Sequence, residues 1–240
     1  MELAGYMAAL RRDGRRMAEA AEDTLDRQVP TCPAWTVADL VWHTADVHTF
    51  WRQIASRVIA EPDAYVEPVR PADGELVARF RTGVEETARE LEALDPALPV
   101  WTWSRQQDVG FIQRRVAQET AVHCWDALHA AGREEPIDAA LAVDGVDEFL
   151  DLFLPGRPSH LEGSGQTVHL HATDTDGEWV VRAGDGACQV KRTHGKGDAA
   201  VRAPASDLLL LLWRRRAPDQ LEVHGDRAAL DRFLARTDLD

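Results

Sequence analysis

The spacing of apolar residues changes once along the chain. From residue 3 to residue 153, apolar side chains recur every three or four positions, the period that lines one face of an α-helix. This pattern predicts helices over residues 3–22, 37–60, 74–94, 111–130 and 137–153. Long helices joined by loops indicate an antiparallel bundle of four or five helices.

Local signals mark where the second helix begins. The segment 28–33 contains Pro30 and Pro33, and we expect a loop there because proline breaks a helix. Thr36 has the character of an N-cap, with Asp39 three residues later as in a capping box. The helix should therefore start directly after Thr36.

After Leu154 the helical period gives way to strand-like alternation. Prolines and glycines interrupt residues 155–165, so we place the boundary there, between a helical domain over 1–155 and a second domain over 165–240. Short alternating runs predict strands over 167–172, 178–182, 187–192, 199–202 and 221–224. Further runs predict helices over 206–214 and 226–236, which complete a small α+β domain.

The predicted helix 111–130 carries a carboxylate and an imidazole on one face. Glu119 and His123 are four residues apart, and apolar Ile112 and Val116 share their stripe, so this face should point inward. A buried carboxylate is costly unless it is paired, hydrogen-bonded or bound to a metal. From this helix alone, either a structural Glu–His hydrogen bond or a functional site explains the pattern.

A third residue favours the site. His43 lies on the inward side of the second predicted helix, whereas His48 lies nearer its flank. Taken alone, an inward histidine is a core residue. Together with Glu119 and His123 it gives two imidazoles and one carboxylate with a free fourth position, a common catalytic zinc set that also suits iron or nickel. Asp126, one turn beyond His123, is either a partner of that histidine or an ordinary surface acid.

Composition narrows the class of protein. The 240 residues carry a formal net charge of −14, which argues against a nucleic-acid or anionic-membrane partner. The N-terminus has no signal-peptide pattern, and no apolar run reaches membrane-spanning length. Three widely spaced cysteines indicate reduced thiols in the cytoplasm. We interpret Cys32, Cys124 and Cys188 as small buried thiols rather than nucleophiles.

The other histidines give weaker signals. None shows metal-ligand spacing on a supporting helix, although His169 and His171 would share one face of a strand. The set comprises His129, His160, His169, His171, His194 and His224.

Four segments resemble a known family in order and spacing across nearly the whole chain. They are TCPAWTVADLVWHTADVH (31–48), RRVAQETAVHCWDA (114–127), APASDLLLLLWRR (203–215) and LEVHGDRAALDRF (221–233). They are similar to the mycothiol-dependent maleylpyruvate isomerase family. The resemblance implies a DinB-like four-helix bundle followed by a small sterol-carrier-like α+β domain.

The resemblance also implies a metal site and an arginine. In that family a divalent metal, usually zinc, is held by a histidine on the second helix and an ExxxH pair on the fourth, here His43, Glu119 and His123. The family places a functional arginine in the second domain, and Arg214 is our candidate, with Arg215 and Arg227 as alternatives. For any one of these arginines, a solvent-exposed basic residue is the simpler interpretation.

The implied activity is metal-dependent chemistry with mycothiol as cosubstrate, either a cis–trans isomerisation or an S-transfer. A thiol bound to a metal becomes a thiolate at neutral pH. Two alternatives stay open: a non-catalytic protein that binds a metal or small ligand, and a metal-dependent hydrolase that uses water. We expect small-molecule and thiol partners, a cytoplasmic location, and a monomer or weak dimer. Neither the organic substrate nor the resident metal follows from the sequence: the resemblance favours zinc, with nickel or iron as alternatives, and membership of the family does not establish maleylpyruvate as the substrate.

Overall fold

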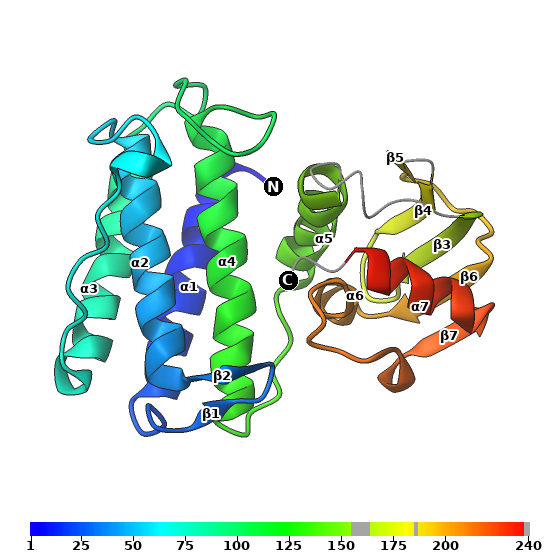
Figure 1. Ribbon diagram of the computed structural model, residues 1–240, viewed down its shortest axis with the longest axis horizontal. Helices are drawn as coiled ribbons and strands as arrows, with labels where there is room; N and C mark the ends of the chain where they lie inside the picture. The colour runs from blue at the N-terminus through cyan, green and yellow to red at the C-terminus, as the bar shows by residue number, and fades with distance from the viewer. Residues whose placement is uncertain (155–163, 185–186, 238–240) are drawn as a thin grey trace. The chain divides into compact units, whose positions relative to one another are not determined.

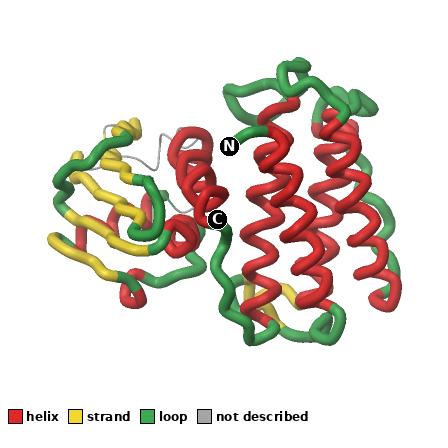
Figure 2. Tube along the Cα trace, turned by 180° about the vertical axis from the view of Figure 1, so that it is seen from behind, coloured by secondary structure: helices red, strands yellow, loops and turns green. Residues whose placement is uncertain are grey.

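The computed structural model describes residues 1–154, 164–184 and 187–237, and it divides into two compact units, Met1–Glu135 and Pro136–Asp240. Among the described residues, no helix is both long enough and apolar enough to cross a membrane. The first unit is helical and the second mixes helices with a sheet (Figures 1 and 2). This confirms the predicted fold class, a helical bundle followed by a small α+β domain.

The first unit is a four-helix bundle. Its helices are α1 (Leu3–Ala21), α2 (Val37–Ala55), α3 (Asp73–Glu92) and α4 (Val109–Ala130). Helix α1 packs against α3 and α4, and α2 packs against the same two helices. Buried side chains of all four form the core, among them Leu10, Met17, Leu40, Ile54, Phe80, Leu91 and Ile112.

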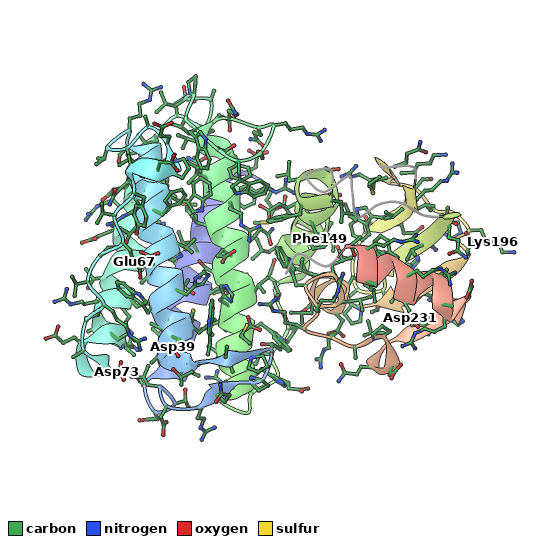
Figure 3. The ribbon with its side chains drawn as sticks, viewed as in Figure 1. Asp39, Glu67, Asp73, Phe149, Lys196 and Asp231 are labelled. Carbon is green, nitrogen blue, oxygen red and sulfur yellow. The ribbon has the colours of Figure 1, made fainter. Side chains whose placement is uncertain are left out.

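The start of α2 follows the predicted capping box. The backbone N–H of Asp39 donates to the Thr36 hydroxyl, and the backbone N–H of Thr36 donates to the Asp39 carboxylate. Arg70 ties Asp39 to Asp73 at the start of α3, with distances of 2.6 and 3.2 Å (both aspartates are labelled in Figure 3). The first turns of two neighbouring helices are thereby held together by one guanidinium.

The segment before α2 corrects a prediction. Instead of a loop over 28–33, β1 (Gln28–Val29) and β2 (Cys32–Thr36) form a short antiparallel hairpin. Its prolines do not prevent this. Pro30 lies in the turn, and Pro33 lies in a strand of a sheet only two strands wide, where a missing N–H is tolerated. Proline excludes a helix here, as predicted, but does not exclude a strand.

The second unit contains α5 (Ala139–Glu148), which continues into a π-helical turn, η2 (Phe149–Phe153). The sheet has the strand order β5-β4-β3-β6-β7 over the described residues, with β3 and β6 parallel and the other pairs antiparallel. Its strands are β3 (Ser164–Ala172), β4 (Glu178–Gly184), β5 (Ala187–Lys191), β6 (Ala199–Ala203) and β7 (Glu222–Gly225). Helices α6 (Ala205–Leu212) and α7 (Arg227–Arg236) both pack against β3 and β6.

Strand alternation gives this sheet two different faces. Val168 and Leu170 on β3 are buried, and their partners across the β3–β4 ladder, Val181 and Trp179, are buried as well. Residues in between point to the opposite face, because successive side chains of a strand alternate. That opposite face carries His169, His171 and Glu178.

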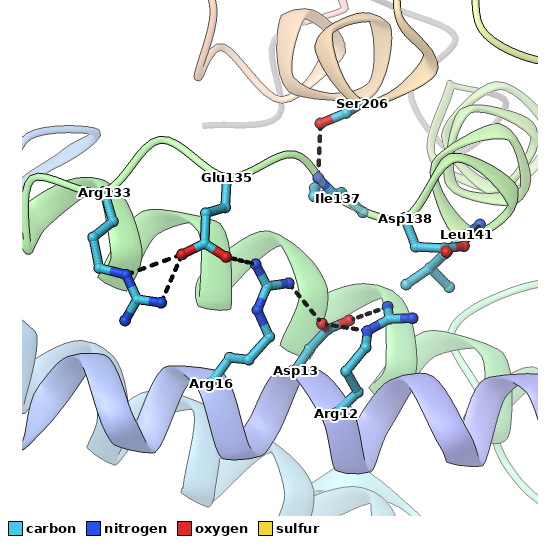
Figure 4. A network of polar contacts seen from close by, with 9 residues as sticks. All are labelled: Arg12, Asp13, Arg16, Arg133, Glu135, Ile137, Asp138, Leu141 and Ser206. Atoms are coloured by element: carbon cyan, nitrogen blue, oxygen red, sulfur yellow. Dashed lines mark hydrogen bonds and ion pairs between the residues drawn. The ribbon is translucent and has the colours of Figure 1, made fainter.

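The boundary between the units lies earlier than the predicted 155–165. Glu135 accepts hydrogen bonds from Arg16 and Arg133 of the first unit, whereas the Ile137 N–H donates to Ser206 on α6 (Figure 4). Helix α5 packs on α6 and so belongs to the second unit. Helical periodicity shows that a segment has an apolar face, but not which partner covers it. Most of the predicted boundary lies outside the described residues.

Candidate metal centre

Helices α2 and α4 bring His43, Glu119 and His123 together. His43 Nε2 lies 3.4 Å from Glu119 Oε1, and His123 Nε2 lies 3.1 Å from the same oxygen. All three ligand atoms lie within 4.8 Å of one another. Glu119 and His123 meet because they are one turn apart on α4, and His43 reaches them from α2, which packs alongside.

These distances fit a metal. Zinc binds histidine nitrogen and carboxylate oxygen at about 2.0–2.1 Å, so two ligands of a tetrahedral ion lie about 3.3 Å apart. The measured 3.1 and 3.4 Å separations are close to that value. The three residues supply three donors, which leaves a fourth position for a ligand from solution.

Asp126 lies directly behind His123. Its Oδ2 lies 3.0 Å from His123 Nδ1, and its Oδ1 accepts a 2.6 Å hydrogen bond from the Thr31 hydroxyl. Asp126 is fully buried, so its interpretation as an ordinary surface acid is wrong and the alternative, a partner of His123, holds. A carboxylate at Nδ1 fixes the ring and leaves Nε2 to face the site, an arrangement typical of metal-binding histidines. Thr31 belongs to the turn of the hairpin that the sequence did not predict.

Arg115 holds the other side of Glu119. Its Nη2 lies 3.0 Å from Glu119 Oε2, while Oε1 faces the two histidines. Sequence analysis missed Arg115, although it stands four residues before Glu119 and such pairs meet on a helix. Its burial, at 4% exposure, distinguishes it from a surface arginine.

The charged side chains of this group favour a positive charge at His123. Burial acts against the charged form of His123, but the hydrogen bonds with Asp126 and Glu119 outweigh it and raise its pKa to about 9. Burial likewise acts against ionised Glu119, yet His123, His43 and Arg115 hold its pKa well below the usual range. The two carboxylates thus stabilise positive charge at His123, and a metal ion would supply that charge instead of the proton.

The α2 histidines differ from their predicted positions. The sequence predicts that His43 points inward, but 36% of its side chain is exposed. Its ring lies beside Trp35, with the two ring centroids 4.7 Å apart. His48, expected on the flank, is buried and hydrogen-bonded to Thr120. The inward stripe of α2 is therefore rotated toward His48, and His43 lies at its rim, where the group is open to solvent.

The other candidate residues lie elsewhere. Cys124 is buried and burial raises the pKa of its thiol far above the usual range, which suits a packing role, whereas Cys32 and Cys188 are only partly buried. In the second unit, the Arg214 guanidinium donates to the carbonyls of Leu211, Leu212 and Leu234 and to Thr237. It thereby binds the C-terminal ends of α6 and α7.

The alternative arginines also have partners. Arg215 donates to the Trp213 carbonyl, and Arg227 forms ion pairs with Asp219 and Asp231. The assignment of a functional arginine in the second unit stays a prediction.

The fold of this chain is similar to that of solved protein structures. A helical bundle followed by an α+β unit also occurs in a solved structure described as the mycothiol-dependent maleylpyruvate isomerase, with a TM-score of 0.65, 13% identity, and coverage of 94% of this chain and 95% of that one. A histidine-to-alanine mutant of that protein matches with a TM-score of 0.64 and the same identity and coverage. No curated protein matches the sequence at a significant level.

Family models cover both units. The model of the mycothiol maleylpyruvate isomerase N-terminal domain matches residues 6–128, and that of the corresponding C-terminal domain matches residues 140–232. The chain belongs to the mycothiol-dependent maleylpyruvate isomerase family, as the four sequence segments indicated. The gap between the two matches contains the division at Glu135 and Pro136.

Proposed function

We propose that the protein is a metal-dependent enzyme that uses mycothiol as cosubstrate, as an isomerase or an S-transferase. The observation that carries the proposal is the convergence of His43 and His123 on one oxygen of Glu119, with Asp126 behind His123. A purely structural Glu–His pair needs neither the second histidine nor the buried second carboxylate. Membership of the family supports the choice of thiol.

Each residue of the group has a separate task. Asp126 accepts a hydrogen bond from the Nδ1–H of His123 and so keeps the Nε2 lone pair of that ring turned toward the site. Arg115 holds one Glu119 oxygen, which leaves the other in place as a ligand. His43, the most exposed of the three ligands, lies at the side from which a small molecule enters.

A divalent metal at this position would supply the positive charge that lowers the pKa of a thiol to the neutral range. Zinc suits two imidazoles and one carboxylate, and nickel or iron accept the same donors. In an isomerisation the thiolate adds to a cis double bond conjugated with a carbonyl, the resulting single bond rotates, and the thiolate leaves. In an S-transfer it displaces a leaving group or opens an epoxide and stays attached.

The negative charge that develops on such a substrate needs a cation. Arg214 remains our candidate in the second unit, although its guanidinium binds helix-end carbonyls. Turnover that falls in Arg214→Lys at unchanged thermal stability would support this role. Equal loss of turnover and stability would assign Arg214 to structure alone.

Metal analysis followed by calorimetry tests the proposal. Zinc-loaded protein should bind mycothiol and release a proton, so the heat should differ between buffers of different ionisation enthalpy. His43→Ala should bind far less, and His224→Ala, which changes an exposed histidine on β7, should behave like the unmodified protein. Metal uptake without thiol binding would favour the binding-protein or hydrolase alternatives. A hydrolase would turn over esters or amides without any thiol.

A further inference from the structure

A second group of potential metal ligands lies on the open face of the sheet in the second unit. His169 and His171 come from β3, Glu178 from β4, and His194 from the connection between β5 and β6. One donor atom from each of the four lies within 4.8 Å of the other three. We propose that these four side chains bind a divalent transition metal that prefers imidazole, such as zinc. This inference does not depend on the proposed function.

Strand register creates the group. His171 and Glu178 are direct partners across the β3–β4 ladder, and His169 lies two residues before His171 on the same face. His171 Nδ1 lies 2.7 Å from Glu178 Oε1, and His169 Nε2 lies 3.4 Å from Glu178 Oε2. Three donors from two neighbouring strands thus meet at one carboxylate.

The β5–β6 connection brings the fourth donor. His194 Nδ1 lies 2.9 Å from Glu178 Oε2. Gly197 lets this connection lie close to the sheet, because a Cβ there would stand 2.8 Å from the His169 backbone nitrogen and 3.2 Å from its Cβ. The connection, on which Lys196 is labelled in Figure 3, therefore covers His169 and leaves His194 exposed.

His169 carries the observation that a simple hydrogen-bond network does not explain. Its side chain is 8% exposed, and its buried Nε2 lies 3.4 Å from Glu178 Oε2, a contact at the far limit of distance that lacks the geometry of a hydrogen bond among the described residues. A buried polar atom without a partner costs about 1–3 kcal/mol. This nitrogen faces Glu178, which already receives His171 and His194. A metal among the four donors would occupy the Nε2 lone pair.

Four protein ligands make a closed site, the type that zinc occupies when it stabilises structure. The ion would tie β3, β4 and the β5–β6 connection together. A cavity of about 460 Å³, lined in part by His171 and Glu178, lies beside the group and offers a way in from solution. The net charge of −14 also favours cations near the protein.

Equilibrium dialysis of the full chain with zinc alone, followed by metal analysis, tests the inference. His123→Ala, which disables the first group, should retain one zinc per chain. Adding His171→Ala and His194→Ala should lower the affinity of that zinc by more than about tenfold. His123→Ala with His224→Ala is the matched control, because His224 pairs with Glu222 on the same sheet and belongs to neither of the two groups found among the described residues.

A second readout separates binding from misfolding. Zinc should raise the unfolding temperature of His123→Ala and of the control, but not of the variant that also lacks His171 and His194. The exposed position of His194 makes its replacement compatible with folding, which circular dichroism can verify. If His123→Ala binds no zinc, or binds it equally well without His171 and His194, the second site does not exist. Either outcome leaves the thiol proposal at the first group intact.

Discussion

Two histidine–carboxylate groups of similar composition occur among the described residues, and they are built differently. The first rests on two helices, and a buried carboxylate, Asp126, lies behind one of its histidines. The second rests on two strands and a connection, with four donors and His194 largely exposed. As proposed, the first group would leave one metal position free for a thiol, and Asp126 would orient its histidine from behind. The second, as proposed, would direct all four donors at one ion, as a closed structural site does.

The sharpest way to break this comparison is to remove His123. In His123→Ala, only two donors remain in the first group, and two ligands seldom hold zinc. At zinc concentrations 100 to 1,000 times the Kd, the variant should lose about 2.7–4.1 kcal/mol of metal-dependent stability. Denaturant unfolding with zinc and with a chelator measures this difference. An unchanged zinc effect would show that the stabilising ion lies elsewhere.

Asp126 should matter next. Asp126→Asn keeps a side chain that can accept the Thr31 hydroxyl bond but removes the charge behind His123. Zinc affinity of the first group should fall about 10–100-fold, while that of the second group stays constant. Competition with a coloured chelator, in the background of His171→Ala and His194→Ala, measures the first site alone. Equal affinity in both forms would contradict the orienting role of Asp126.

In metal-free protein, the pKa of a histidine in the first group and that of a histidine in the second group should be shifted in opposite directions from the usual value. The pKa of His123 is raised to about 9, whereas burial lowers that of His169 despite Glu178. The pKa of His123 in the unfolded chain is about 6.5. Its contribution to the free energy of unfolding is therefore fully present below about pH 6.5 and is lost as the pH rises toward 9. Stability linked to His169 is present above pH 6.5 and is lost as the pH falls.

Proton NMR of the imidazoles, after metal removal, measures these midpoints directly. His48, buried and lowered to a pKa of about 4, serves as a reference on the acidic side. His123→Gln should remove the loss of stability between pH 6.5 and 9. A His123 midpoint at or below 6.5 would mean that Asp126 and Glu119 do not hold the proton.

The smallest effect should come from His194. Without metal, His194→Ala removes one exposed contact to Glu178, and stability should change by no more than about 0.5 kcal/mol. With zinc, the same change should remove a ligand and lower the metal-dependent gain. Thermal unfolding in both conditions gives the contrast. A large loss without metal would assign His194 a packing role.

The difference between the groups also explains what the sequence could predict. Glu119 and His123 were found because helical spacing alone places them on one face, and the Thr36–Asp39 capping box was found for the same local reason. His169 and His171 share a strand face by spacing. Glu178 joins them only through the register of a ladder, and His194 only through the path of a connection. A local sequence pattern predicts neither the register of the ladder nor the path of the connection.

The sequence also did not predict which polar side chains of the bundle are buried. Asp126 and His48 are both buried polar groups of the bundle, yet the helical pattern placed His48 on the flank and left Asp126 open between a partner of His123 and a surface acid. Their partners, Thr31 and Thr120, come from other elements, so the reason for burying them appears only in three dimensions. The same holds for α5, whose apolar face was evident but whose partner, α6, was not.

The Thr31 hydroxyl offers a way for the hairpin turn to change the properties of His123 without a change in the helices. Thr31 lies between β1 and β2, outside the helices that form the core, and its hydroxyl donates a hydrogen bond to Asp126, the carboxylate behind His123. Replacing Thr31 with serine, valine or alanine would keep or remove the hydrogen bond to Asp126. This would change in steps how strongly His123 donates electrons to a bound metal, while the bundle stays the same. Relatives that share this scaffold could thus diverge in reactivity through a turn residue, without any change to the ligands themselves.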